Sequence, residues 1–79
     1  MTKILLVEDD ELNREMVTRR LELAGYQIIS AENGAAAVAL AQAALPNLIL
    51  MDLDLPVLNG WRAAQQIKAQ RRDLLLHVG

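Results

Sequence analysis

The chain has 79 residues, a formal net charge of −2 and no cysteine. This length allows one small domain, residues 1–79, with a limited core, because short chains bury a smaller share of their surface. Acidic and basic residues are interspersed, so we expect no nucleic-acid partner and no membrane partner. The absence of cysteine excludes a disulfide framework, and together with the lack of an N-terminal apolar segment it favours a cytoplasmic protein.

The first two predicted elements are a strand and a helix. Residues 3–7 (KILLV) form a continuous apolar run, which is typical of a strand buried on both faces. Residues 11–24 carry apolar side chains at near-helical spacing, with acidic residues early and basic residues late. Gly25 follows directly and is expected to end this helix.

The rest of the chain continues the alternation of strand and helix. Residues 26–31 predict a second strand, 35–44 an alanine-rich helix and 48–51 (LILM) a third buried strand. Helix formers recur over 60–72, and 74–78 (LLLHV) could begin a fourth strand. The order βαβαβα with a final stub predicts an α/β fold with a parallel sheet.

Carboxylates follow two of the predicted strands. Glu8 and Asp9 come directly after the first strand, and Asp52 comes directly after the third. In an open parallel sheet the binding crevice lies beyond the carboxyl ends of the strands, where the strand order reverses. These side chains would converge if the first and third strands are neighbours, which gives the strand order 2-1-3.

Such a cluster of acids favours a divalent cation, because close carboxylates repel one another. Oxygen ligands suit Mg²⁺ better than zinc, and Mg²⁺ also accompanies phosphoryl transfer. Any one of these acids taken alone is more simply a helix cap or a solvated turn residue, and Asp10 is expected to be such a cap. The convergence of two strand ends is what favours a site.

Three stretches of the chain resemble one known family. ILLVEDDELNREM, SAENGAAAVALAQ and PNLILMDLDLPVLNGW are similar to the receiver domains of two-component response regulators, the CheY-like family. The resemblance implies a flavodoxin-like parallel sheet with strand order 2-1-3, here an incomplete βαβαβα with a possible fourth-strand stub. It also implies a phosphate-accepting module of a phosphorelay rather than an enzyme, with a sensor histidine kinase or a phosphotransfer protein as its partner.

The resemblance also implies roles for individual residues. Asp52 would be the phosphoacceptor and a metal ligand, and Glu8 and Asp9 would be the acidic pair that holds Mg²⁺. Asp54 would contribute its backbone carbonyl to the metal.

The chain departs from the family pattern in its length. In the family that this chain resembles, a complete receiver has five βα units. This chain has three and a stub, so we expect a C-terminally truncated receiver domain. A Ser or Thr and a Lys that the family uses to hold the phosphoryl group would then be absent, and phosphotransfer would be weak. The Asp52-Leu53-Asp54 sequence also resembles haloacid-dehalogenase-type hydrolases, but the later residues that those enzymes use do not follow.

The alternative function is a receiver remnant that self-associates with little or no phosphotransfer. In a sheet of order 2-1-3 the third strand, 48–51, lies at an edge unless residues 74–78 cover it. The unpaired backbone groups of an exposed edge can bind another chain. We therefore expect a homodimer, joined through this exposed third-strand edge or by exchange of the C-terminal segment.

Overall fold

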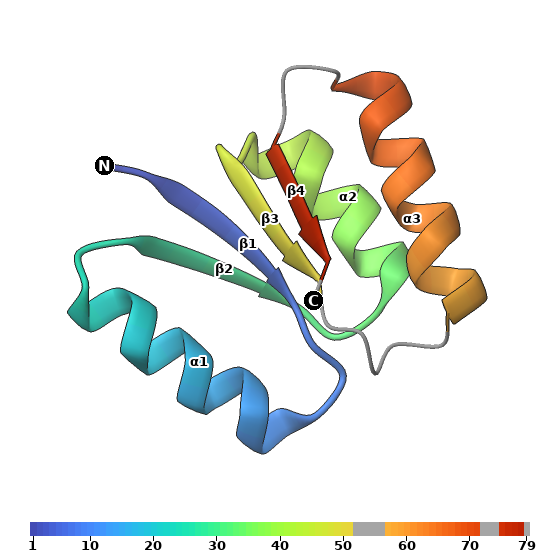
Figure 1. The fold of residues 1–79 in the computed structure, drawn as a ribbon. Helices are drawn as coiled ribbons and strands as arrows, with labels where there is room; N and C mark the ends of the chain where they lie inside the picture. The colour runs from blue at the N-terminus through green and yellow to red at the C-terminus, as the bar shows by residue number, and fades with distance from the viewer. Residues whose placement is uncertain (52–56, 72–74, 79) are drawn as a thin grey trace.

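The computed structural model describes residues 1–51, 57–71 and 75–78. Figure 1 shows strands and helices that alternate along the chain. The elements are β1 (Lys3–Val7), α1 (Glu11–Leu23), β2 (Gln27–Ala31), α2 (Gly34–Ala44), β3 (Leu48–Met51), α3 (Val57–Gln70) and β4 (Leu75–Val78). Among the described residues, no helix has the length and apolar character needed to cross a membrane.

The four strands form one parallel sheet in the order β2-β1-β3-β4 (Figure 1). This confirms the predicted α/β fold and the neighbouring positions of the first and third strands. The predicted stub is a strand, since Leu48 of β3 is aligned with Leu75 of β4. β3 therefore pairs on both sides and is not an edge, so the predicted dimer contact through an exposed third-strand edge is wrong, and β4 is the outer strand instead.

Local signals in the sequence set the ends of α1 and α2. The Asp10 carboxylate accepts a hydrogen bond from the Asn13 backbone N–H (2.9 Å), as an N-cap does. Asn33 caps α2 in the same way, accepting from the Ala36 backbone N–H (2.8 Å). Gly25 has φ +100°, a left-handed conformation that ends α1 at little steric cost.

The third helix starts earlier than the sequence predicted. α3 begins at Val57 rather than at residue 60, so Gly60 lies inside the helix. The predicted helix covered residues 60–72, so the turn before Gly60 lay outside its predicted bounds. In the sequence Pro56 directly precedes Val57, and proline is common at helix starts.

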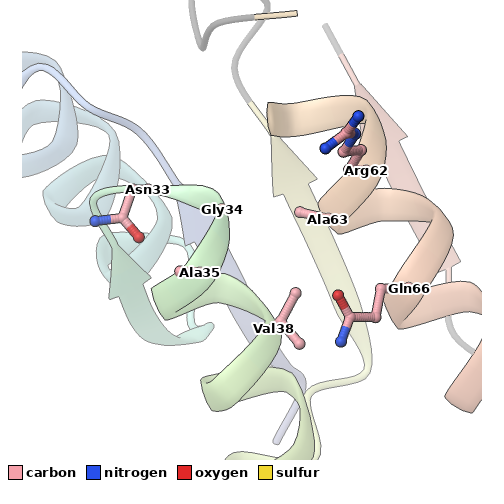
Figure 2. Close-up of a pocket in the computed structure, with 7 residues that line it drawn as sticks. All are labelled: Asn33, Gly34, Ala35, Val38, Arg62, Ala63 and Gln66. Carbon is pink, nitrogen blue, oxygen red and sulfur yellow. The ribbon is translucent and has the colours of Figure 1, made fainter. Parts of the chain in front are cut away.

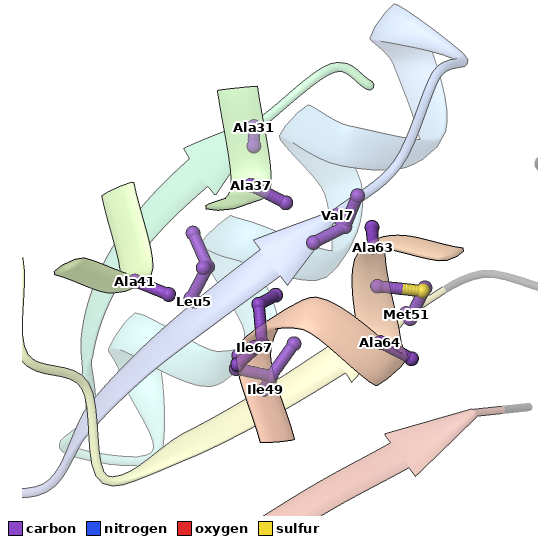
Figure 3. Close-up of a cluster of buried hydrophobic side chains, with 10 residues drawn as sticks. All are labelled: Leu5, Val7, Ala31, Ala37, Ala41, Ile49, Met51, Ala63, Ala64 and Ile67. Carbon is purple, nitrogen blue, oxygen red and sulfur yellow. The ribbon is translucent and has the colours of Figure 1, made fainter. Parts of the chain in front are cut away.

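The two faces of the sheet are covered unequally. α2 and α3 pack on one face and enclose the main core (Figures 1 and 3). Alanines of α2 and α3 let these helices approach the sheet closely. The buried residues of this main core are Leu5, Val7, Ala31, Ala37, Ala41, Ile49, Met51, Ala63, Ala64 and Ile67. On the opposite face α1 packs against β1 and β2, and no residue of α1 is fully buried.

This asymmetry predicts different costs for two similar truncations in β3. Ile49 is 0% exposed in the main core, whereas its neighbour Leu50 points to the other face and is only half-buried. We expect Ile49→Ala to lower the free energy of unfolding by about 2–5 kcal/mol, and the matched Leu50→Ala to lower it by clearly less. Urea unfolding followed by circular dichroism measures both. Equal losses would show that the two faces are packed equally.

Candidate functional site

The predicted site lies where β1 and β3 end. The two strands are parallel neighbours, and Val7, the last residue of β1, is aligned with Met51, the last residue of β3. Glu8 and Asp52 are the next residues in sequence after these two. Asp52 and Asp54 lie outside the described residues, so the structure places two of the four predicted site residues, both after β1.

Glu8 is a buried carboxylate with a fixed backbone. It is 6% exposed, the one buried charged residue within the part of the chain that the structure describes. Its backbone N–H donates to the Ala31 carbonyl (3.0 Å), which ties it to the end of β2. Its Oε1 atom accepts a hydrogen bond from the Asp10 backbone N–H (3.1 Å). Glu8 is therefore held in place before any ligand binds.

Asp9 and Asp10 differ in what their side chains do. Asp9 is exposed and lies in the bend between β1 and α1, so its carboxylate is accessible to an ion from solvent. The Asp10 carboxylate is engaged as the N-cap of α1. The prediction that Asp10 is a cap is thus confirmed.

Arg14 is a residue that the sequence analysis missed. Its guanidinium Nη1 donates to the Glu8 carbonyl oxygen (2.9 Å) and so joins the first turn of α1 to the β1–α1 loop. The contact orients the backbone that carries Glu8 and Asp9. The one available signal in the sequence was a basic residue soon after the acidic residues that end β1. A hydrogen bond from a side chain to a backbone carbonyl, however, has no distinctive sequence pattern.

A separate hollow of about 370 Å³ lies between α2 and α3 (Figure 2). Its described lining residues are Asn33, Gly34, Ala35, Val38, Arg62, Ala63 and Gln66. None of these residues is acidic, and none was predicted as a site residue. Its described lining residues therefore offer no carboxylate ligand for a cation, and the hollow is not the predicted metal site.

The donors that the structure does place fit a hard cation. Glu8 and Asp9 offer carboxylate oxygens, the ligand type that Mg²⁺ prefers. Among the described residues, no group of three His, Asp or Glu side chains could hold a metal ion. The other two predicted ligands, Asp52 and Asp54, lie outside the described residues.

Most of the chain matches a known family. The family model for the response regulator receiver domain matches residues 4–77. The chain therefore belongs to the response regulator receiver domain family, which confirms the resemblance.

Curated relatives support this membership. The chain is 42% identical over 67 residues to Protein PilH of Pseudomonas aeruginosa, covering 85% of this chain and 55% of PilH. It is 37% identical over 75 residues to the polar-differentiation response regulator DivK of Brucella anthropi, covering 95% of this chain and 59% of DivK. The chain thus spans somewhat more than half the length of these two relatives.

Solved structures show the same fold. The response regulator TrrA of Thermotoga maritima, in complex with Mg(2+)-BeF, has a TM-score of 0.88 and 30% identity, with 96% of this chain and 66% of that chain covered. TrrA in complex with the histidine kinase ThkA also gives a TM-score of 0.88, at 29% identity, covering 99% of this chain and 67% of that chain.

Proposed function

We propose that this receiver domain accepts a phosphoryl group on Asp52, with Mg²⁺ held by Glu8, Asp9, Asp52 and the backbone carbonyl of Asp54. The observation that carries the proposal is the parallel pairing of β1 with β3, in register from Ile4 to Val7. The pairing ends β1 and β3 at the same end of the sheet, beside Glu8 and Asp9. Asp52 is the next residue in the sequence after Met51, which supports the proposal.

The chemistry follows from the residue types. A carboxylate oxygen of Asp52 would form a bond to phosphorus while the bond between phosphorus and the donor breaks, giving an acyl phosphate. The bound cation would offset the negative charge on the transferred group. Glu8, which is held by the Asp10 N–H, would contribute an oxygen at a preset position. Asp9, which is exposed, would contribute a ligand from the solvent side.

The proposed partner is a sensor histidine kinase or a phosphotransfer protein. Support comes from the TrrA structure, in which a similar response regulator is in complex with a histidine kinase. The Mg(2+)-BeF complex of the same protein supports the cation. In this role the domain is a cytoplasmic signalling module that receives a phosphoryl group from its partner rather than an enzyme.

Self-association is the second candidate function. It is favoured by large apolar side chains on the surface, including Leu75 of the outer strand β4, which is 68% exposed. Exchange of the C-terminal segment between two copies would use this strand.

The first test of the proposal is a metal titration with two matched variants. Asp9→Asn should weaken Mg²⁺ or Mn²⁺ binding at least about tenfold, because it removes a charged ligand. Asp10→Asn removes a neighbouring charge but keeps a side chain that caps α1 equally well, so binding should change little. Calorimetric titration measures both affinities. Equal weakening by the two variants would mean that only net charge matters, and would contradict a ligand role for Asp9.

The second test is chemical phosphorylation. Incubation of the chain with acetyl phosphate and Mg²⁺ should add one phosphoryl group, seen by intact mass, and Asp52→Asn should abolish the addition. We expect the labelling to require Mg²⁺, because the cation offsets the negative charge on the transferred group. Labelling that persists in Asp52→Asn, or that needs no metal, would contradict the proposed acceptor.

A further inference from the structure

Helix α1 has an outer side on which apolar residues are exposed to solvent. Leu12, Met16 and Leu23 are 75, 49 and 83% exposed. On the sheet-facing side of the same helix, Val17 and Leu21 are partly buried. In Figure 1 α1 lies apart from the α2 and α3 layer, with its outer side away from the strands. Burying these side chains in a contact would be favourable.

The exposed residues have the spacing of a helix-pairing seam. Leu12, Met16, Arg19 and Leu23 follow one another at intervals of four, three and four residues. This alternation is the pattern of the inward-facing positions of two packed helices. The pattern is also the same when read in reverse, about a point midway between Met16 and Arg19. A seam with that property is complementary to its own copy in the antiparallel direction.

The surface of α1 also contains the matching hollow. A cavity of about 270 Å³ has five described lining residues, which all belong to α1: Glu15, Met16, Arg19, Arg20 and Leu23. Four of these, at positions i, i+3, i+4 and i+7 from Met16, make the kind of hole into which a side chain of a facing helix inserts. Methionine is well suited to fill such a hole, because its side chain is flexible and polarisable.

We propose that α1 pairs with α1 of a second copy of this chain, as an antiparallel two-fold dimer. In this arrangement Met16 of the partner subunit inserts into the hollow of α1, and the reverse contact follows by symmetry. Leu12 packs against Leu23 of the partner subunit, twice. The contact between the two helices thus buries the three large apolar residues of α1 that are otherwise exposed, Leu12, Met16 and Leu23.

The charges along the seam agree with this alignment. Glu15 lies just outside the seam, on the side of the helix that Arg19 borders, and a two-fold axis keeps that side facing its own copy. Arg19 then lies within about one residue, roughly 1.5 Å along the axis, of Glu15 of the partner subunit. Two symmetric ion pairs result. A parallel alignment would instead place each Arg19 beside Arg19 of the partner subunit.

The expected dimer is weak. α1 has 13 residues, about 20 Å of helix, so the contact is smaller than a standard stable interface. We expect a dissociation constant on the order of 100 µM, within the range of transient contacts. The inference involves neither Asp52 nor a metal, so its failure would leave the proposed phosphotransfer untouched.

Sedimentation equilibrium of the full chain, from about 10 µM to 1 mM, is the first measurement. Met16→Glu should raise the dissociation constant more than about tenfold, because it places a charge in the hollow. Glu15→Arg and Arg19→Glu should each raise it roughly three- to tenfold, and the double variant should restore it. Circular dichroism confirms that each variant is folded. A double variant as weak as the single variants would overturn the proposed alignment.

A cysteine pair tests the direction of the two helices, since the chain has no cysteine of its own. Under oxidising conditions the double variant Leu12→Cys/Leu23→Cys should form a covalent dimer, and Leu12→Cys alone should not. A link within one chain is excluded, because these positions lie about 16 Å apart along the helix. Cross-linking of the single variant would mean a parallel pair and would overturn the proposal.

Leu75→Glu is the control for a contact through β4 and should leave the dissociation constant unchanged. Dimerisation that is lost in Leu75→Glu but kept in Met16→Glu would place the interface on the outer strand. A chain that stays monomeric up to 1 mM, or that binds only a helical partner through α1, would equally refute self-pairing.

Discussion

The parallel pairing of β1 with β3 is the constraint on which the site depends. Because the two strands are separated in sequence by β2 and two helices, their pairing makes β1 the strand at which the connections change direction. Both strands finish at the same end of the sheet, β1 at Val7 and β3 at Met51. Glu8 is held at that end of the sheet by a hydrogen bond from its backbone N–H to the Ala31 carbonyl of β2. The second strand therefore also contributes to the geometry.

The sheet divides the molecule into a well-packed side and an open side. Ile49 and Ile67 are almost completely buried between the sheet and the helices α2 and α3. On the other side α1 covers β1 and β2, while Leu50 remains partly exposed. Parallel sheets usually have both faces covered by helices. The open side is therefore where further contacts of this domain are expected, and the exposed seam of α1 lies on that side.

Much of the fold was predictable because its signals are local. Apolar runs predicted β1, β2 and β3 with bounds that differ by at most one residue, and Asp10 was recognisable as a cap. The start of α3 was not, since helix formers were recognised only from residue 60 onward, whereas the helix begins at Val57. The pairing of β4 with β3 is a long-range contact that no short pattern reveals. For the candidate site, acidic residues at strand ends pointed to Glu8 and Asp9, and their role as metal ligands stays a prediction. The bond from Arg14 to the Glu8 carbonyl depends on tertiary geometry.

Paramagnetic relaxation by Mn²⁺ tests the central claim most directly, because broadening of amide signals falls steeply with distance from the ion. The account predicts the strongest broadening at Val7, Glu8, Asp9 and Met51, and far weaker broadening at Lys3, which lies about 13 Å away at the opposite end of β1. Loss of this pattern in Asp52→Asn would confirm that the ends of β1 and β3 form one metal site. Broadening centred elsewhere, or an unchanged pattern in Asp52→Asn, would contradict a metal site formed by the ends of β1 and β3.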